Sequence, residues 1–225
     1  MKKLFIVGNW KSNKIVRETE EWINVIADSK LQIANSLEII VCPPFTLLHS
    51  FTSAISHMPY AIKLGAQDVS PFPDGAYTGE VSARMLKDLG VSYVMIGHSE
   101  RRKYFKEDDQ MLANKVKEAL DMGIMPIYCV TGKTSVVPTG VKILLYEPPT
   151  AIGSGEAGSP QEANEVAKTL REVSGGETIV LYGGSVSPEN VAEFCKQNNI
   201  NGVGVGGASL DPNKFLKLIE NASKV

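Results

Sequence analysis

Residues whose side chains can do chemistry stand where short apolar runs of the 225-residue sequence end. They supply an amide, an ammonium group, an imidazole and two carboxylates, from Asn9, Lys11, His98, Glu100 and Glu147. A carboxylate can act as a base and an imidazole as an acid, while an ammonium group offsets negative charge. Two further apolar runs end in glycine-rich turns, which can bind an anion through backbone N–H groups. These groups can act together only if the fold brings them to one place.

Eight short apolar runs recur along the chain, with helical patterns between them. The runs are residues 3–9, 37–43, 60–66, 91–97, 125–130, 141–147, 178–184 and 202–207. Most of them are apolar on both faces, which is typical of parallel strands covered on both sides. Eight strand–helix units with short connections favour a closed (β/α)8 barrel over an open doubly wound sheet. We therefore expect residues 1–225 to form a single α/β domain, a closed parallel barrel.

The units between the strands show recognisable helix starts. Ser159, Pro160 and Glu162 form an N-cap, a first-turn proline and a third-position glutamate, and Ser187 with Pro188 repeats the Ser-Pro opening. One unit is incomplete, because only TGKTSVVPTG stands between the fifth and sixth runs. We expect the fifth outer helix to be missing or vestigial. Apolar strand surface left uncovered there would favour a subunit contact.

In a parallel barrel the carboxyl ends of the strands share one face, and that face carries the active site. The amide, ammonium, imidazole and carboxylate groups are therefore expected at one mouth. With 23 Lys and Arg against 25 Asp and Glu, the chain has no basic field that would hold nucleic acid or a membrane. No run of side chains has metal-ligand spacing. The three cysteines, Cys42, Cys129 and Cys195, have no paired spacing, which fits a reducing, cytoplasmic location.

Six stretches taken together resemble the triosephosphate isomerase family in order and spacing. They are GNWKSN, GAQDVSPFPDGAYTGEVSA, IGHSERRKYF, YEPPTAIGSG, YGGSV and VGVGGASL. The resemblance spans almost the whole chain and implies a barrel enzyme that interconverts dihydroxyacetone phosphate and D-glyceraldehyde 3-phosphate through an enediol(ate). It implies no metal and no organic cofactor.

The resemblance also assigns roles to the residues at the strand ends. Glu147 matches the base that moves the proton, and His98 matches a neutral electrophile that polarises the substrate carbonyl. Lys11 matches the electrostatic stabiliser, with Asn9 holding the neighbouring oxygen and Glu100 keeping the ammonium group in place. The position of His98 just before a helical turn supports a neutral ring, since a helix N-terminus disfavours imidazolium.

The substrate phosphate is expected on backbone N–H groups of the glycine-rich turns. By the resemblance these belong to Gly153, Ser185, Gly206 and Gly207, although taken alone the glycines could equally be tight turns. Residues 148–158 are expected to form a closing lid that excludes water from the intermediate. Tyr182, with Ser185, is expected to receive the closed lid through hydrogen bonds.

The family pattern also implies a homodimer. The QDVSPFPDGAYTGE stretch reaches into the neighbouring subunit in the family, and Thr78 matches a residue at that contact. Self-packing of this long loop is the alternative. The sequence departs from many members at the lid, where Pro149 and Thr150 stand, and the missing fifth helix resembles a shorter form, so a tetramer is also possible.

Other interpretations remain open at this point. The barrel could act on another sugar phosphate, or it could be a noncatalytic scaffold or sugar-phosphate-binding protein. Retention of a general base together with the electrophile argues against a binding role alone. We expect His49 and His57 to be core histidines, and Cys129 to support the packing near the glutamate instead of acting as a nucleophile.

Overall fold

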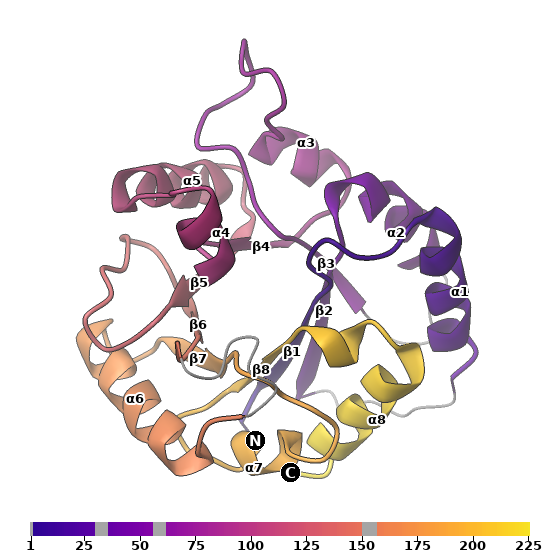
Figure 1. Ribbon diagram of the computed structural model, residues 1–225. Helices are drawn as coiled ribbons and strands as arrows, with labels where there is room; N and C mark the ends of the chain where they lie inside the picture. The colour runs from indigo at the N-terminus through magenta and orange to yellow at the C-terminus, as the bar shows by residue number, and fades with distance from the viewer. Residues whose placement is uncertain (1, 30–35, 56–61, 150–156) are drawn as a thin grey trace.

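Eight parallel strands close into a barrel, as the sequence predicts (Figure 1). The structure is a computed structural model, and it describes residues 2–29, 36–55, 62–149 and 157–225. Each strand pairs with the next along the chain, and the first strand pairs with the last to complete the ring. The strands are β1 (Leu4–Asn9), β2 (Leu37–Cys42), β3 (Ile62–Ala66), β4 (Tyr93–Ile96), β5 (Met125–Val130), β6 (Ile143–Tyr146), β7 (Ile179–Tyr182) and β8 (Gly202–Val205).

Helices surround the barrel and connect successive strands (Figure 1). They are α1 (Val16–Ala27), α2 (Leu48–Ile55), α3 (Ala83–Asp88), α4 (Ser99–Tyr104), α5 (Asp109–Asp121), α6 (Pro160–Val173), α7 (Val191–Cys195) and α8 (Pro212–Ala222), with short 3-10 turns η1 (Phe45–Leu47) and η2 (Gly207–Ser209). Residues 131–142 between β5 and β6 are all described and contain no helix, which confirms the missing fifth outer helix.

The strands beside this gap are covered, so the condition under which we expected a subunit contact there is not met. Tyr128, Val130 and Leu144 belong to the core cluster that also takes in the helices, and each is no more than 1% exposed. Val137 of the connecting segment packs against the same cluster. A connection without a helix can therefore still cover the strands, and only Val136 of this segment is a large hydrophobic residue left exposed.

Alternate side chains of the strands point to two separate apolar cores. The inner core fills the barrel and includes Phe5, Val7 and Leu145. Two glycines make room for Leu145, because a Cβ on Gly183 or Gly204 would lie only 2.9 or 2.8 Å from its side chain. The leucine therefore fills the barrel directly beneath the strand ends that carry the polar residues.

The predicted helix starts are confirmed at one place and corrected at another. The Ser159 side chain caps α6 by accepting the backbone N–H of Glu162. Ser187 does not begin a helix in the same way, since α7 starts only at Val191. The reason lies in the intervening turn, where the Ser187 side chain and backbone bind the N–H groups of Glu189 and Val191.

The loop between β3 and α3 projects away from the barrel (Figure 1). Phe72 and Tyr77 stack on each other there, with ring centroids 4.3 Å apart, and both side chains are exposed. At the start of the loop, the Asp68 carboxylate accepts from Lys115 of α5, which is 2% exposed and also binds Glu107. In the described parts of the chain, no helix is long and apolar enough to cross a membrane.

Candidate active site

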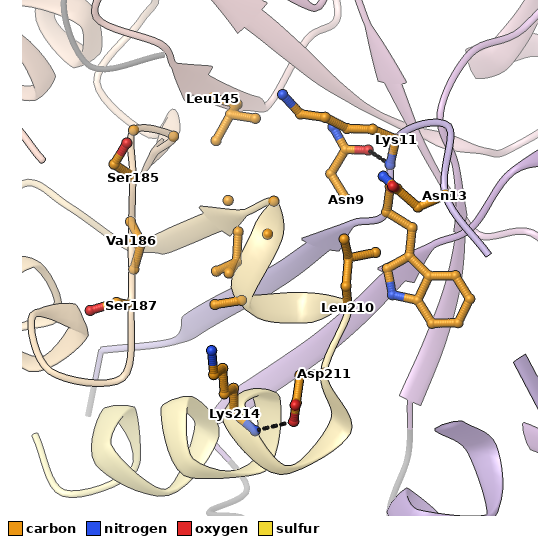
Figure 2. A pocket seen from close by; sticks show the side chains of 18 of the residues that line it. Asn9, Lys11, Asn13, Leu145, Ser185, Val186, Ser187, Leu210, Asp211 and Lys214 are labelled. Carbon is orange, nitrogen blue, oxygen red and sulfur yellow. Dashed lines mark hydrogen bonds between the residues drawn. The ribbon is translucent and has the colours of Figure 1, made fainter. Parts of the chain in front are cut away.

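A cavity of about 870 Å³ opens at the carboxyl ends of the strands. The predicted site residues that line it are Asn9, Lys11, His98, Glu147, Ser185, Gly206 and Gly207. Figure 2 shows how Asn9 and Lys11 come from one side of the cavity and Ser185 from the other. Gly153 and the rest of the predicted lid from residue 150 to residue 156 lie outside the described residues. The fold thus gathers side chains that are far apart in the sequence.

His98 and Glu147 meet directly within this cavity. The Nε2 atom of His98 lies 2.9 Å from Oε1 of Glu147. Both residues are buried, with 7% and 2% of their surface exposed. His98 follows β4 as the N-cap of α4, and Glu147 follows β6, so the separation is set by two strand ends of one barrel.

The hydrogen bonds of His98 identify its tautomer. Its Nδ1 accepts the backbone N–H of Glu100 at 3.2 Å, so this nitrogen carries a lone pair. The Glu100 carboxylate stands 3.7 Å from the same nitrogen, beyond hydrogen-bond distance. The ring proton therefore lies on Nε2, where it faces Glu147. This tautomer places the Nε2 N–H so that it donates toward Glu147.

Glu147 is held by its neighbours in a defined position. Its Oε2 accepts the backbone N–H of Ser99 at 2.9 Å, and its own backbone N–H binds the Val130 carbonyl at 2.8 Å. Burial raises the pKa of the adjacent Cys129 thiol, and the Glu147 carboxylate raises it further. Cys129 therefore stays protonated against the glutamate, in a setting that does not make it a nucleophile.

Lys11 has a backbone conformation that lysine rarely adopts, with φ at 52°. The Asn9 side chain accepts its N–H at 3.0 Å, and the Gln67 side chain donates to its carbonyl at 2.8 Å. Its ammonium group forms an ion pair with Glu100. A strained residue held from both sides of its backbone is a common feature of functional sites.

The opposite wall of the cavity is formed after β7 and β8. Ser185 has a positive φ of 47°, Gly206 is the N-cap of the turn η2, and Gly207 is its first residue. The Cβ that Gly207 lacks would meet no heavy atom within 4 Å, so this glycine leaves open space. The first backbone N–H groups of a helical turn donate to no carbonyl within the turn, so they are free to bind an anion.

Tyr182 lies beneath the far end of the predicted lid. Its hydroxyl accepts the backbone N–H of Gly158 at 2.7 Å, and its ring stacks on Phe194. Of the remaining predicted residues, Thr78 is exposed on the projecting loop. His49 is exposed on α2 instead of lying in the core, because its helix turns that face to solvent, and His57 lies outside the described residues.

Sequence reasoning did not single out several residues that shape the site. The Ser99 amide and the Gln67 side chain both orient predicted residues, and Leu145 lines the cavity from the barrel interior. Ser99 and Gln67 stand within the motifs GHSERR and GAQDVS, but only the folded chain gives their partners. Among the described residues, no group of three or more His, Cys, Asp or Glu side chains is placed to hold a metal ion.

Known proteins are similar to this chain along almost its whole length. The family model described as triosephosphate isomerase matches residues 4–141 and 139–222. The chain is 42% identical to the triosephosphate isomerase of Natranaerobius thermophilus, covering 100% of this chain and 98% of the relative. It is 40% identical to the corresponding protein of Aquifex aeolicus, covering 95% and 97% of the two chains.

Fold and site together define a (β/α)8-barrel enzyme with a carboxylate and an imidazole at the mouth of the barrel. The extent and identity of the matches then settle which such enzyme family it is. The chain belongs to the triosephosphate isomerase family.

Proposed function

We propose that this protein interconverts dihydroxyacetone phosphate and D-glyceraldehyde 3-phosphate, a step of glycolysis and gluconeogenesis. The reaction moves one proton between adjacent carbons and another between their oxygens. It requires a base, a hydrogen-bond donor at the carbonyl and stabilisation of an enediolate. Membership of the family and the contents of the cavity support this assignment.

Glu147 is the proposed base. Its carboxylate removes a proton from the carbon next to the carbonyl, and the C–H electron pair forms the carbon–carbon double bond of the enediolate. His98 donates its Nε2 proton in a hydrogen bond to the carbonyl oxygen, where negative charge develops. The glutamic acid then returns a proton to the neighbouring carbon. The reaction consumes no redox partner, because electrons only move within the substrate.

Lys11 and Asn9 complete the reacting end of the proposed site. The ammonium group of Lys11 offsets the charge of the enediolate and the phosphate, and Asn9 orients Lys11 through its backbone N–H. Glu100 holds the same ammonium group by an ion pair. At the other end, backbone N–H groups of Ser185, Gly206 and Gly207 are proposed to bind the phosphate, and Tyr182 to support the lid.

One observation carries the proposal: the buried carboxylate of Glu147 and the Nε2 nitrogen of His98 are 2.9 Å apart in a cavity that also contains a lysine. A protein that only binds phosphate needs no such base. The pair also places donor and acceptor close enough for a single three-carbon substrate to contact both.

A coupled spectrophotometric assay of the purified protein tests the activity. We expect turnover in both directions, and a Glu147→Gln variant should lose about two to four orders of magnitude in kcat. Glu172→Gln is a matched control, because Glu172 is an exposed residue of α6. An inactive wild-type protein that still binds triose phosphate would instead indicate the noncatalytic alternative, and activity confined to another sugar phosphate would indicate a different barrel enzyme.

We also propose that the active form is at least a homodimer. Ile15, Phe45, Phe72 and Tyr77 are exposed apolar side chains on the segments that follow β1, β2 and β3, which are neighbouring strands. They therefore form one sector of the barrel rim, and Thr78 lies on the same projecting loop. Sedimentation at micromolar concentration distinguishes monomer, dimer and tetramer, and a fully active monomer would exclude the proposal.

A cytoplasmic location is proposed on the state of the cysteines. Cys42, Cys129 and Cys195 are all free and buried. Free thiols suit a reducing compartment. Fractionation of cells that express the chain, with an antibody against it, tests this location.

A further inference from the structure

The segment between β7 and α7 forms the wall of the cavity opposite Lys11. Figure 2 shows Ser185, Val186 and Ser187 following one another along this wall. Ser185 has φ at 47°, in the left-handed region, which costs a residue other than glycine roughly 1–2 kcal/mol. Something in the surrounding structure must therefore hold this conformation.

The side chain of Asn190 does so with both ends of its amide. Its Oδ1 accepts the backbone N–H of Ser187 at 2.9 Å, and its Nδ2 donates to the backbone carbonyl of Ser185 at 3.3 Å. The identity of the two partners fixes which end of the amide is oxygen and which is nitrogen. The pair of bonds joins the start of the segment to its end.

Asn190 is well placed to anchor the segment to the rest of the fold. It is the N-cap residue of α7, and α7 is joined to the same turn by the bond from Val191 N–H to the Ser187 carbonyl at 3.1 Å. Phe194 of α7 is in turn fully buried and stacks on Tyr182. The packing of α7 therefore sets the position of the Asn190 amide.

Holding the Ser185 carbonyl fixes the peptide plane that follows it and limits rotation about the left-handed residue. The orientation of the Ser185 N–H and hydroxyl then depends on Asn190. We propose that Asn190 is a positioning residue for the substrate phosphate, acting through Ser185 without touching the substrate. This inference rests on the proposed function, in which Ser185 binds the phosphate.

The chain contains a matched control for this residue. Asn221 of α8 donates its side-chain amide to the backbone carbonyl of Pro188 at 2.8 Å, and so anchors the same segment. That bond is made at Pro188 and not at Ser185. Loss of either asparagine removes a bond from an asparagine amide to a carbonyl of the segment, but only Asn190 acts on the left-handed residue.

The experiment compares Asn190→Ala with Asn221→Ala by steady-state kinetics. Two substrates are used, D-glyceraldehyde 3-phosphate and unphosphorylated D-glyceraldehyde, with inorganic phosphate as a competitive inhibitor of the first. For Asn190→Ala we expect KM for the phosphorylated substrate and Ki for inorganic phosphate to rise about three- to tenfold, the change that one net hydrogen bond supports. The kcat/KM for the phosphorylated substrate divided by that for the unphosphorylated substrate should fall by the same factor.

For Asn221→Ala we expect that ratio and the Ki for phosphate to equal the wild-type values. Equal losses with both substrates in Asn190→Ala would show a general structural role and overturn the proposal. Asn190→Asp provides a second test if the alanine variant does not fold, because a carboxylate still accepts from Ser187 but cannot donate to Ser185. If Asn190→Asp kept the wild-type Ki for phosphate and the wild-type ratio of kcat/KM, the inference would also be overturned. An inactive wild-type protein would instead contradict the proposed function.

Discussion

His98 Nε2 and Glu147 Oε1 lie 2.9 Å apart, and each is fixed by a backbone N–H from the start of α4. The Glu100 amide binds the histidine ring and the Ser99 amide binds the carboxylate. One helical turn therefore orients both proposed catalytic side chains. This makes the first turn of α4 a structural unit of the site, although none of its backbone atoms takes part in the proposed proton transfer.

Replacement of His98 by asparagine should lower kcat sharply. The imidazole donor is buried and pre-oriented, and loss of one such donor at a developing negative charge costs about 10²–10³ in kcat. KM should change much less, because the hydrogen bond strengthens mainly as charge develops. His49→Asn is a matched control, since His49 is an exposed histidine on α2. Coupled assays of both variants check this, and near-normal turnover of His98→Asn would remove the histidine from the mechanism.

Lys106 should be replaceable by glycine with a gain in stability. It is an exposed residue between α4 and α5 with φ at 59°, a conformation that glycine adopts without steric cost. Relief of this strain outweighs the added flexibility of the unfolded chain, so we expect a gain of about 0.5–1 kcal/mol in the free energy of unfolding. Urea unfolding followed by circular dichroism measures it.

The same substitution at Lys103 is the control for that experiment. Lys103 is also exposed but lies within α4, where glycine is unfavourable. Lys103→Gly should lower stability by about 1 kcal/mol. If both variants changed stability in the same direction, the backbone conformation at Lys106 would not be the cause.

Lys115→Met should destabilise the fold by about 3–5 kcal/mol, because it removes one of the two cations that the carboxylates of Asp68 and Glu107 share and leaves a buried negative charge uncompensated. The ammonium group lies 2.6 Å from Asp68 and 2.6 Å from Glu107, and Arg101 also binds both acids. Burial raises the pKa of Asp68 even in the presence of these cations. Lys117→Met is the control, because Lys117 is an exposed residue of the same helix. Urea unfolding measures both variants, and equally small losses of stability would contradict this account.

Alkaline pH should weaken the fold through its buried thiols. Burial raises the pKa of Cys42 to about 12 and that of Cys195 to about 11, against 9.0 for a free thiol. The folded chain keeps these protons while the unfolded chain releases them. The stability that these protonated thiols contribute to the fold is therefore fully present below pH 9. It is lost as pH rises toward 11–12, at about 1.4 kcal/mol of unfolding free energy per pH unit for each thiol.

Urea unfolding at several pH values between 8 and 11 measures that slope. Cys42→Ala should reduce the slope of unfolding free energy against pH by the contribution of one thiol. A loss of stability through packing would shift the whole curve and leave this change of slope in place. Parallel curves for the variant and the wild type would show that Cys42 does not contribute.

Much of the barrel could be predicted because its strands are apolar on both faces and its connections are short. Strand boundaries were less accurate, as the run 91–97 shows, since only Tyr93–Ile96 forms β4. The C-terminal end of that run leaves the sheet because Gly97 has a positive φ of 75° and His98 is the N-cap of α4. Apolar composition indicates where a strand lies, but backbone geometry decides where it stops.

The candidate site was predictable for residues whose chemical type is unusual at a strand end, such as Glu147 and His98. Residues that act through the backbone of others were not. The amide of Ser99 and the side chains of Gln67 and Asn190 have ordinary types for loops, and their importance depends on which carbonyl or N–H they face. That information exists only after the barrel has closed.

The helix-free connection after β5 and the pairing of β1 with β8 together allow the chain to be reconnected in a different order. The side chain of Lys2 donates to the carbonyls of Cys195 and Gln197 at the end of α7, which packs against the last helix, α8, and the marks N and C fall close together in the view of Figure 1. A short linker between the two chain ends, with new ends opened within residues 131–142, would preserve every strand pairing. Circular permutation at this helix-free connection would thus change the order of synthesis while leaving the architecture and the site intact.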